Sequence, residues 1–289
     1  LDFAINRSVR EIEGVDTEVI NRIYENANGV EVEKVFPKQE LKGNNYYVLK
    51  NGNASVLACY DPIRRVIRKV EKPNVFGIYP KNAEQAFAVD ALLNPNIQLV
   101  AISGKAGTGK TLLALASALH QNKQYEFIYL ARPIVALSSK DLGFLPGDVN
   151  EKVDPYMQPL YDNLGFIKRR FNIHGAENRL IEEMQKEQKL MISALAYIRG
   201  RSLSDVYFIV DEAQNLTPHE VKTIITRAGE GTKMVFTGDI DQIDSPYLDK
   251  KSNGLSHLFD KMQGQDIFAH VHLEKGERSK LADLASDLL

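Results

Sequence analysis

Apolar and polar positions change their spacing near residue 73, which divides the chain into two patterns. Before it, alternating residues 46–50 and 54–60 flank the turn sequence Asn51–Gly52–Asn53, and two such runs around an asparagine-glycine turn predict a β-hairpin. Residues 64–70 alternate again, whereas the apolar positions before residue 28 are partly spaced as in a helix. We therefore expect a small β-rich accessory domain over residues 1–72.

Short apolar runs recur along the rest of the chain and are separated by helical patterns. Strands that alternate with helices favour a parallel sheet with helices on both faces. The best-marked helix start is Thr217–Glu220, which has a capping residue, a proline in the first turn and a glutamate three residues after the cap. We predict an α/β domain over residues 73–289. Its expected strands are residues 99–103, 126–131, 206–210, 233–237 and 269–273.

Composition narrows the class of protein. The 289 residues are 44% hydrophobic and 26% charged, which is enough for one large core and a small second domain. The formal net charge of −2 gives no global basic field, so any nucleic acid would have to bind local patches. Cys59 is the only cysteine, which fits a reducing cytoplasm. No run approaches the roughly 18 apolar residues of a membrane helix, so we expect no membrane segment.

A glycine-rich loop after the first apolar run carries the strongest chemical motif. Residues 104–111 read GKAGTGKT, which fits the pattern G-x-x-x-x-G-K-[ST] between a strand and a helix. Its backbone N–H groups and the helix N-terminus would face phosphate. Lys110 would reach the β- and γ-phosphates, and the Thr111 hydroxyl would bind Mg²⁺. The expected ATP contacts are Gly104, Ala106, Gly107, Thr108, Gly109, Lys110, Thr111 and Leu112.

Two acidic residues follow the apolar run 206–210. Asp211 could hold the Mg²⁺ shell, and Glu212 could orient or deprotonate the attacking water. Acidic residues are also favoured at the start of a helix, but a complete P-loop upstream favours the catalytic interpretation. Since transfer of phosphate to water needs a group that positions the water, Glu212 favours hydrolysis over nucleotide binding alone.

The segment TGDIDQID, residues 237–244, admits two interpretations. It does not fit a calcium loop, because Ile243 stands at the third ligand position and Lys250 stands where the closing glutamate belongs. After a parallel strand, the segment would instead lie in the ligand crevice. Gln242 could then hydrogen-bond the γ-phosphate or the attacking water, because an amide both donates and accepts. An ordinary polar turn remains the alternative.

These motifs together resemble those of two related groups of ATPases. DEAQ at 211–214 with GDxxQ at 238–242 resembles motifs II and III of superfamily 1 helicases, and residues 82–85 resemble their adenine-reading glutamine motif. Residues 273–284 are similar to the motif whose arginine contacts the γ-phosphate. The closer resemblance, over residues 75–289, is to the PhoH family and particularly its PhoH2-like branch. It rests on Arg132–Pro133, Leu142–Gly147, Glu151–Lys152, Pro155–Tyr156, Tyr197–Gly200 and Pro246–Leu248.

The resemblance implies a RecA-like core that hydrolyses ATP with Mg²⁺. It also implies a single-stranded RNA partner, a homo-oligomeric ring (a hexamer) and, in the PhoH2-like branch, RNA unwinding. By the same resemblance Gln85 reads adenine. Arg278 and Arg132 are candidates for the arginine that completes the ATP site, from the same chain or from a neighbouring subunit. Longer members carry an N-terminal nuclease domain; Leu1 would suit a start just after it, and we expect no nuclease activity from this chain.

Three functions stay open at this point. The main hypothesis is an ATP-driven motor acting on RNA, and the second is an ATPase that remodels a protein partner or acts as a regulatory switch. A small-molecule kinase is weakest, because it would not need the DEAQ and GDxxQ pair. Basic clusters at 64–69, 168–170 and 199–201 could contact RNA phosphates, although a short charge run is most often a solvated face.

Overall fold

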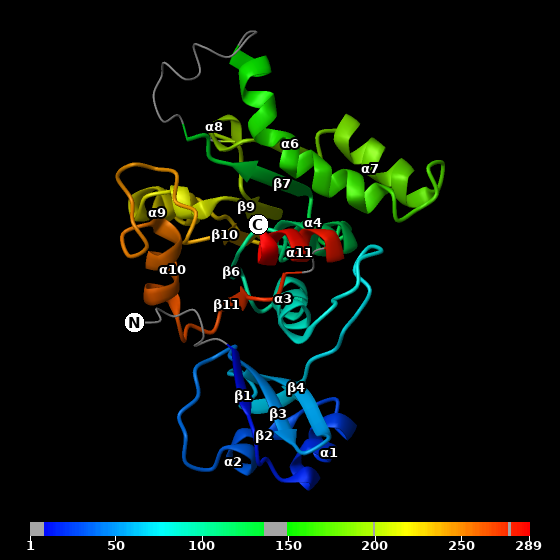
Figure 1. Ribbon diagram of the computed structural model, residues 1–289, viewed down its shortest axis with the longest axis vertical. Helices are drawn as coiled ribbons and strands as arrows, with labels where there is room; N and C mark the ends of the chain where they lie inside the picture. Colours follow the sequence, from blue (N-terminus) through cyan, green and yellow to red (C-terminus); the bar gives the residue numbers. More distant parts are fainter. Residues whose placement is uncertain (1–8, 136–148, 199, 277–278) are drawn as a thin grey trace.

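Two β-sheets organise the chain, and residues 70–98 connect them (Figure 1). The computed structural model describes residues 9–135, 149–198, 200–276 and 279–289. The smaller sheet has five strands in the order β1-β3-β4-β5-β2, and the larger has six in the order β11-β6-β10-β9-β7-β8. In Figure 1 the small sheet lies at the bottom, and the large sheet with its helices lies above it.

The small sheet is built round the predicted hairpin. β3 and β4 pair antiparallel across the Asn51–Ala54 turn, and β5 pairs with β4, so the hairpin and the third run are confirmed. β1 and β2 were not predicted; β1 runs parallel to β3, and β2 pairs with β5 over two residues. The elements are β1 (Val9–Ile12), α1 (Thr17–Glu25), β2 (Val30–Glu31), α2 (Val32–Val35), β3 (Tyr46–Asn51), β4 (Ala54–Asp61) and β5 (Val66–Lys69).

The large sheet is parallel at every pairing, which confirms the predicted α/β class. β10 lies between β6, which leads into the P-loop, and β9, which leads to Asp211. This RecA-like order brings the P-loop, the acidic pair and the loop after β10 to one edge of the sheet. The five predicted strands are present, and β8 is added at the edge. The strands are β6 (Leu99–Gly104), β7 (Phe127–Arg132), β8 (Leu190–Ala194), β9 (Val206–Val210), β10 (Lys233–Gly238) and β11 (Phe268–Leu273).

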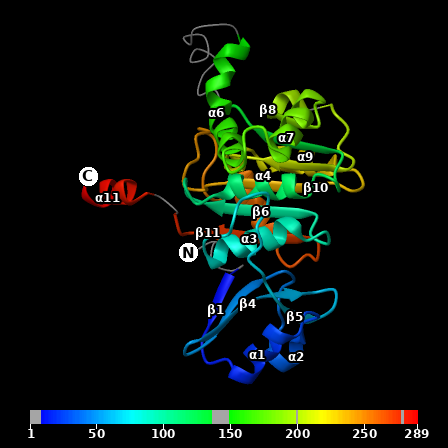
Figure 2. The ribbon, with the colours of Figure 1, turned by 90° about the vertical axis from the view of Figure 1, so that its right-hand side faces the viewer.

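Helices cover both faces of the large sheet (Figure 1), and Figure 2 looks onto the face that carries α3, α4 and α6. One buried cluster joins alternate strand residues to α3, α4, α6 and α7, and another joins the intervening residues to α8, α9 and α10. This two-sided burial explains the apolar runs in the sequence. α9 has the predicted capping box at Thr217 and Glu220. The helices are α3 (Ala83–Leu93), α4 (Lys110–His120), α6 (Val149–Lys168), α7 (Ala176–Lys186), α8 (Leu195–Ile198), the 3-10 helix η1 (Ala213–Asn215), α9 (Pro218–Thr226), α10 (Gly254–Met262) and α11 (Lys280–Leu288).

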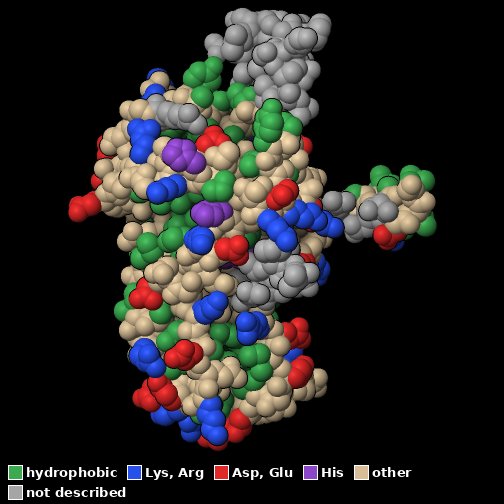
Figure 3. Space-filling view, turned by 90° about the vertical axis from the view of Figure 1, so that its left-hand side faces the viewer, with side chains coloured by type: hydrophobic (Ala, Val, Ile, Leu, Met, Phe, Trp, Pro, Cys, Tyr) green, Lys and Arg blue, Asp and Glu red, His purple; other side chains and the backbone are tan. Residues whose placement is uncertain are grey.

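Basic and acidic side chains are interspersed on the face that carries α9 and α10 (Figure 3). This distribution agrees with the balanced net charge of −2. Within the described ranges, no helix is both long enough and apolar enough to span a bilayer.

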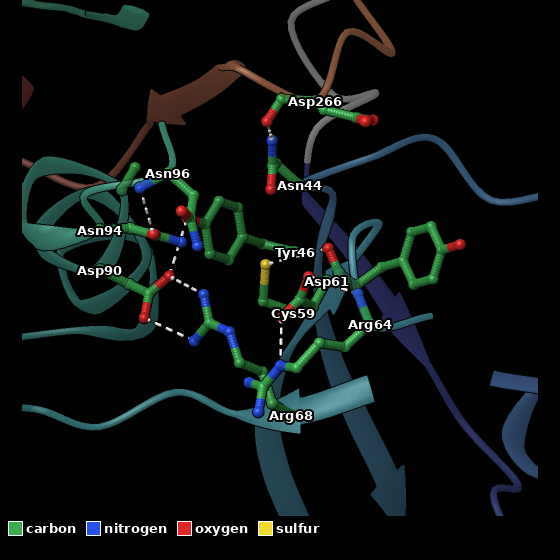
Figure 4. Close-up of polar contacts among 12 residues, drawn as sticks. Asn44, Tyr46, Cys59, Asp61, Arg64, Arg68, Asp90, Asn94, Asn96 and Asp266 are labelled. Atoms are coloured by element: carbon green, nitrogen blue, oxygen red, sulfur yellow. Dashed lines mark hydrogen bonds and ion pairs between the residues drawn. The ribbon is translucent and has the colours of Figure 1, made fainter. Parts of the chain in front are cut away.

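Helix α3 joins the two sheets through a largely buried ion pair (Figure 4). Arg68 of β5 donates two hydrogen bonds, of 2.8 and 2.7 Å, to the Asp90 carboxylate in α3. The Tyr46 hydroxyl donates to the same carboxylate at 3.0 Å, and its ring stacks on Phe87 with centroids 5.0 Å apart. Buried side chains from before and after residue 72 belong to one cluster here. Our domain boundary at residue 72 therefore stays a prediction.

Candidate functional site

The P-loop takes the backbone conformation that its glycines permit. Gly104, Gly107 and Gly109 have φ angles of +154°, +82° and +92°, which residues with side chains rarely adopt. A Cβ atom at Gly104 would also lie 2.5 Å from the Leu273 carbonyl oxygen, so this position needs a residue without a side chain. The loop leads directly into α4, whose N-terminus is a site for an anion such as phosphate.

Lys110 is the first residue of α4, and its ammonium lies back over the loop. Nζ donates a hydrogen bond to the Lys105 carbonyl oxygen at 2.9 Å. Burial lowers the pKa of Lys110, and the nearby carboxylates of Asp211, Asp239 and Glu212 act in the opposite direction. A bound phosphate would supply acceptors for this ammonium in place of the carbonyl.

Asp211 is the centre of a buried hydrogen-bond cluster at the end of β9. Its Oδ1 atom accepts from the hydroxyls of Thr111, at 2.9 Å, and Thr237, at 2.6 Å. Its Oδ2 atom accepts from Arg132 Nη2 at 2.8 Å and Nε at 3.2 Å. Thr237 was not predicted as a site residue; it lies at the end of β10, and only the strand order places it between the other two motifs.

The oxygen atoms of Thr111 and Asp211 fit a magnesium ion. They lie 2.9 Å apart at the P-loop, and Mg²⁺ takes oxygen ligands from one or two protein groups together with water and substrate phosphates. No group of three or more histidine, cysteine or acidic side chains forms another metal site in the part of the chain that the structure describes.

The Arg132 side chain faces carboxylates of its own chain. Besides its two bonds to Asp211, Nη2 lies 3.8 Å from Glu212 Oε1, and Nη1 donates to the Tyr156 carbonyl at 3.0 Å. The side chain is 18% exposed. To reach the ATP site of a neighbouring subunit, Arg132 would have to break these contacts. The geometry therefore favours a role for Arg132 in the ATP site of its own chain.

Glu212 occupies a backbone conformation that is uncommon for a residue with a side chain. Its φ angle is +55°, in the left-handed region, and such positions concentrate at functional sites. Burial raises the pKa of its carboxyl, and the charge of Asp211 raises it further, while Arg132 acts in the opposite direction. A carboxylate with a raised pKa accepts a proton more readily, which suits a base acting on water.

The Gln214 amide connects Glu212 to the loop after β10. Its Nε2 atom donates to Glu212 Oε2 at 2.6 Å and to the Gln242 carbonyl at 3.1 Å. Its Oε1 atom accepts from the Asp239 N–H at 3.1 Å. Sequence reasoning gave Gln214 no separate role, although an amide beside two carboxylates can bond to both loops at once. The acidic motif and residues 239–242 therefore form one hydrogen-bonded unit.

Gln242 lies at this edge of the sheet with an exposed side chain. Its backbone N–H donates to the Asp239 carbonyl at 3.1 Å, and its own carbonyl accepts from Gln214. The backbone is thus fixed while the side chain faces solvent. The role of this amide as a γ-phosphate sensor stays a prediction.

A cavity of about 480 Å³ opens beside the P-loop toward α6. Gln85 lines it; its Nε2 atom donates to the Thr108 carbonyl at 3.1 Å, and its Oε1 atom accepts from the Lys81 N–H at 2.9 Å. The exposed rings of Tyr79 and Phe166 line the same cavity, and neither was predicted. A cavity of this size with aromatic walls suits a nucleobase.

The remaining predicted site residues lie at different places. Leu112 lines the cavity, and Ala106 lies exposed in the P-loop. Arg278 lies outside the described residues, as do Arg199 and the signature segment 142–147. The segment after β11, which leads to Arg278, begins beside α3. There the Glu84 carboxylate accepts a hydrogen bond from the Glu274 N–H at 2.6 Å.

Comparisons with known proteins find one family, several relatives by sequence and a distant structural neighbour. The family described as PhoH-like protein matches residues 77–287. Protein PhoH2 of Bacillus subtilis is 46% identical over 254 residues, covering 85% of this chain and 56% of that protein. Protein PhoH2 of Mycolicibacterium smegmatis is 36% identical over 218 residues, covering 74% and 48%. The chain thus spans about half the length of these curated relatives. The crystal structure of Pif1 helicase from Candida albicans aligns with a TM-score of 0.37 and 18% identity, covering 71% of this chain and 42% of that one.

Proposed function

The chain belongs to the PhoH-like protein family, and from that premise we propose that it hydrolyses ATP with Mg²⁺ and uses the reaction to move along or unwind RNA. The observation that carries the proposal is the Gln214 amide, which bonds both Glu212 and the loop after β10. A change at the γ-phosphate would therefore reach that loop through a single side chain. A protein that only bound nucleotide would not need this link.

In the proposed reaction, each residue at the P-loop edge has a defined task. Lys110 neutralises charge on the β- and γ-phosphates, and the loop N–H groups orient them. Thr111 and Asp211 would hold Mg²⁺, which when bound supplies a Lewis acid for the phosphate oxygens. Glu212 orients the attacking water and accepts its proton. Arg132 keeps the Asp211 carboxylate in place.

The RNA part of the proposal rests on the resemblance of both loops to helicase motifs. The DEAQ and GDxxQ segments are joined here through the Gln214 amide, which donates to Glu212 and to the Gln242 carbonyl, and this link supports a coupling role. We propose single-stranded RNA as the partner and a cytoplasmic homo-oligomeric ring as the assembly. In such a ring Arg278 could act within its own subunit or on the next one.

ATP turnover with and without RNA tests the proposed function. The purified chain should hydrolyse ATP faster when single-stranded RNA is added at low salt, since RNA binding would favour the hydrolytic arrangement of the loops. Double-stranded RNA is the control. If turnover is indifferent to single-stranded RNA and DNA, and neither binds at low salt, the motor interpretation fails and a switch or protein-remodelling ATPase replaces it.

Replacing Gln242 by alanine should uncouple RNA from hydrolysis. The variant should bind ATP normally, because the backbone contacts of the loop are kept. A hydrogen bond to a charged group contributes roughly 1.5–3 kcal/mol, so the RNA-stimulated rate should fall about 10- to 100-fold. Phosphate release with and without RNA measures this. Gln265→Ala, at an exposed glutamine before β11, is the matched control, and an unchanged RNA response in Gln242→Ala would refute the sensor role.

A further inference from the structure

The C-terminal helix α11 presents a row of exposed leucines. Leu281, Leu284 and Leu288 are 78%, 47% and 77% exposed, and their spacing of three and four residues places them on one face of the helix. Figure 2 shows α11 projecting away from the rest of the molecule, and Figure 3 shows hydrophobic side chains on its surface. A contiguous apolar row of this kind marks an interaction site, unlike a single exposed leucine.

An apolar groove of about 250 Å³ lies between α8 and α9. Along one rim stand the exposed side chains of His219, Thr223 and Arg227, which are four residues apart on α9. The apolar lining is buried and comes from both helices, from β9 and from the chain between α8 and β9. These lining residues are Leu195, Ile198, Leu203, Phe208 and Ile224.

The leucine row and the groove match in length and in polarity. At 1.5 Å per residue, the row from Leu281 to Leu288 is about 10 Å long, and the rim from His219 to Arg227 is about 12 Å long. Insertion of the apolar face of an amphipathic helix into an apolar groove is a recurrent mode of protein recognition. The chain therefore carries both halves of such a contact.

The charges beside the two surfaces are also complementary. Asp287 is exposed next to the leucine row. Arg227 is exposed at one end of the rim, and its Nη2 atom donates to the neutral Arg201 carbonyl at 3.5 Å, so its charge stays available for a carboxylate. Helices that lie on membranes are instead rich in lysine and arginine. Because Lys280 is the single basic residue of α11, a protein groove suits this helix better than a membrane surface.

The order of the strands favours a groove on a second copy of the chain. β11, which leads to α11, forms one edge of the large sheet, whereas α8 follows β8 at the opposite edge. Five strand spacings separate these edges, a distance of about 24 Å. A helix that projects from one edge can reach the same groove on another copy without crossing its own sheet. Such a contact joins unlike surfaces of identical chains, and it closes into a ring when the rotation between subunits allows.

We propose that α11 of one subunit docks its leucine row in the α8–α9 groove of the next subunit, with Asp287 facing Arg227. The proposal rests on the proposed function, since it supplies the subunit contact of the proposed ring. Each subunit offers one helix and one groove, so the same contact repeats around the assembly. The residues of the P-loop edge take no part in it.

Disulfide trapping between two single-cysteine variants tests the contact directly. Leu288→Cys and Thr223→Cys chains are co-expressed and oxidised; the natural Cys59 is buried. The expected product is a covalent pair with twice the mass of one chain. Ile173→Cys, at an exposed apolar position outside the groove, replaces Thr223→Cys in the control. No pair, or an equal yield in the control, overturns the proposal. A chain with both cysteines that crosslinks only within itself would show docking in its own groove and would also overturn it.

The mass of the assembly, measured by sedimentation, tests the leucine row and the charge pair. Leu281→Ser combined with Leu288→Ser should weaken assembly at least about 100-fold, because two apolar anchors are lost together. Ile173→Ser should leave the mass unchanged. Arg227→Glu and Asp287→Arg should each weaken assembly about 10-fold, and together they should restore it, because the pair is then reversed. Unchanged assembly in the leucine variant, or no recovery in the charge-reversed pair, contradicts the proposed contact.

The natural chain distinguishes a failure of this contact from a failure of the proposed function. If the natural chain assembles and the leucine variant assembles equally well, the docking proposal is wrong while the proposed ring stands. If the natural chain is a monomer at every concentration, the ring and the docking contact fall together. RNA-stimulated ATP turnover, measured on the same samples, then judges the motor function by itself.

Discussion

Replacing Lys110 by alanine is expected to reduce ATP turnover by at least about 10²- to 10³-fold, the cost of removing one preorganised electrostatic group from a transition state. The ammonium stands at the start of α4, above the loop that is shaped for phosphate. Burial lowers the pKa of Lys110, because the buried ammonium is poorly solvated by water. A bound anion would therefore stabilise this charge strongly. Alanine also favours helix, so α4 should form normally.

Phosphate release at saturating ATP, with thermal unfolding measured beside it, checks this prediction. Lys123→Ala is the matched control, because Lys123 is an exposed lysine just beyond the other end of the same helix. Normal turnover in Lys110→Ala would refute the assignment of the P-loop. A large loss of stability would show instead that the lysine is structural.

Motifs with fixed local spacing were predictable from the sequence. The P-loop and the capping box at Thr217 depend on residues only a few positions apart, and both have the expected geometry. The hairpin around Gly52 is local in the same way. Strand β8 was missed because it is an edge strand with one neighbour, so its burial is partial and its apolar run is weak.

Contacts that depend on strand order were not predictable. Thr237 reaches Asp211 only because β10 lies between β6 and β9, and no spacing along the chain encodes that order. The same is true of Gln214, whose partners Asp239 and Gln242 lie in the loop after the neighbouring strand β10. The sequence therefore predicted which residues belong to each motif. The hydrogen bonds between the motifs could be seen only in the fold.

The basic cluster at residues 64–69 shows how charge runs mislead. In the structure each of its cations has a carboxylate partner. Arg68 bonds Asp90 in α3, across the junction between the two sheets. This pairing favours a salt-bridged surface over an RNA-binding one for that cluster. RNA contacts are then expected at the P-loop edge of the large sheet. The other pairs are Arg64 with Asp61, Arg65 with Glu33 and Lys69 with Glu71.

Glu212→Gln is expected to bind ATP but to hydrolyse it about 10²- to 10⁴-fold more slowly, the usual contribution of a general base. Glutamine has the same shape, and its carbonyl oxygen can still accept the hydrogen bond from Gln214, so the loop after β10 should stay in place. Nucleotide affinity and single-turnover hydrolysis separate the two effects. Glu230→Gln, at an exposed glutamate, is the control.

The pH dependence of hydrolysis tests whether Glu212 is the general base. The active form of a general base is deprotonated, so the rate should fall as pH drops through the pKa of this carboxyl. Because burial raises that pKa, the fall should begin at a higher pH than for an ordinary glutamate. Glutamine does not titrate, so the slow rate of Glu212→Gln should lack this acid limb. An unchanged limb in the variant would assign the proton acceptor to another group, and a variant that hydrolyses at the natural rate would remove Glu212 from the mechanism.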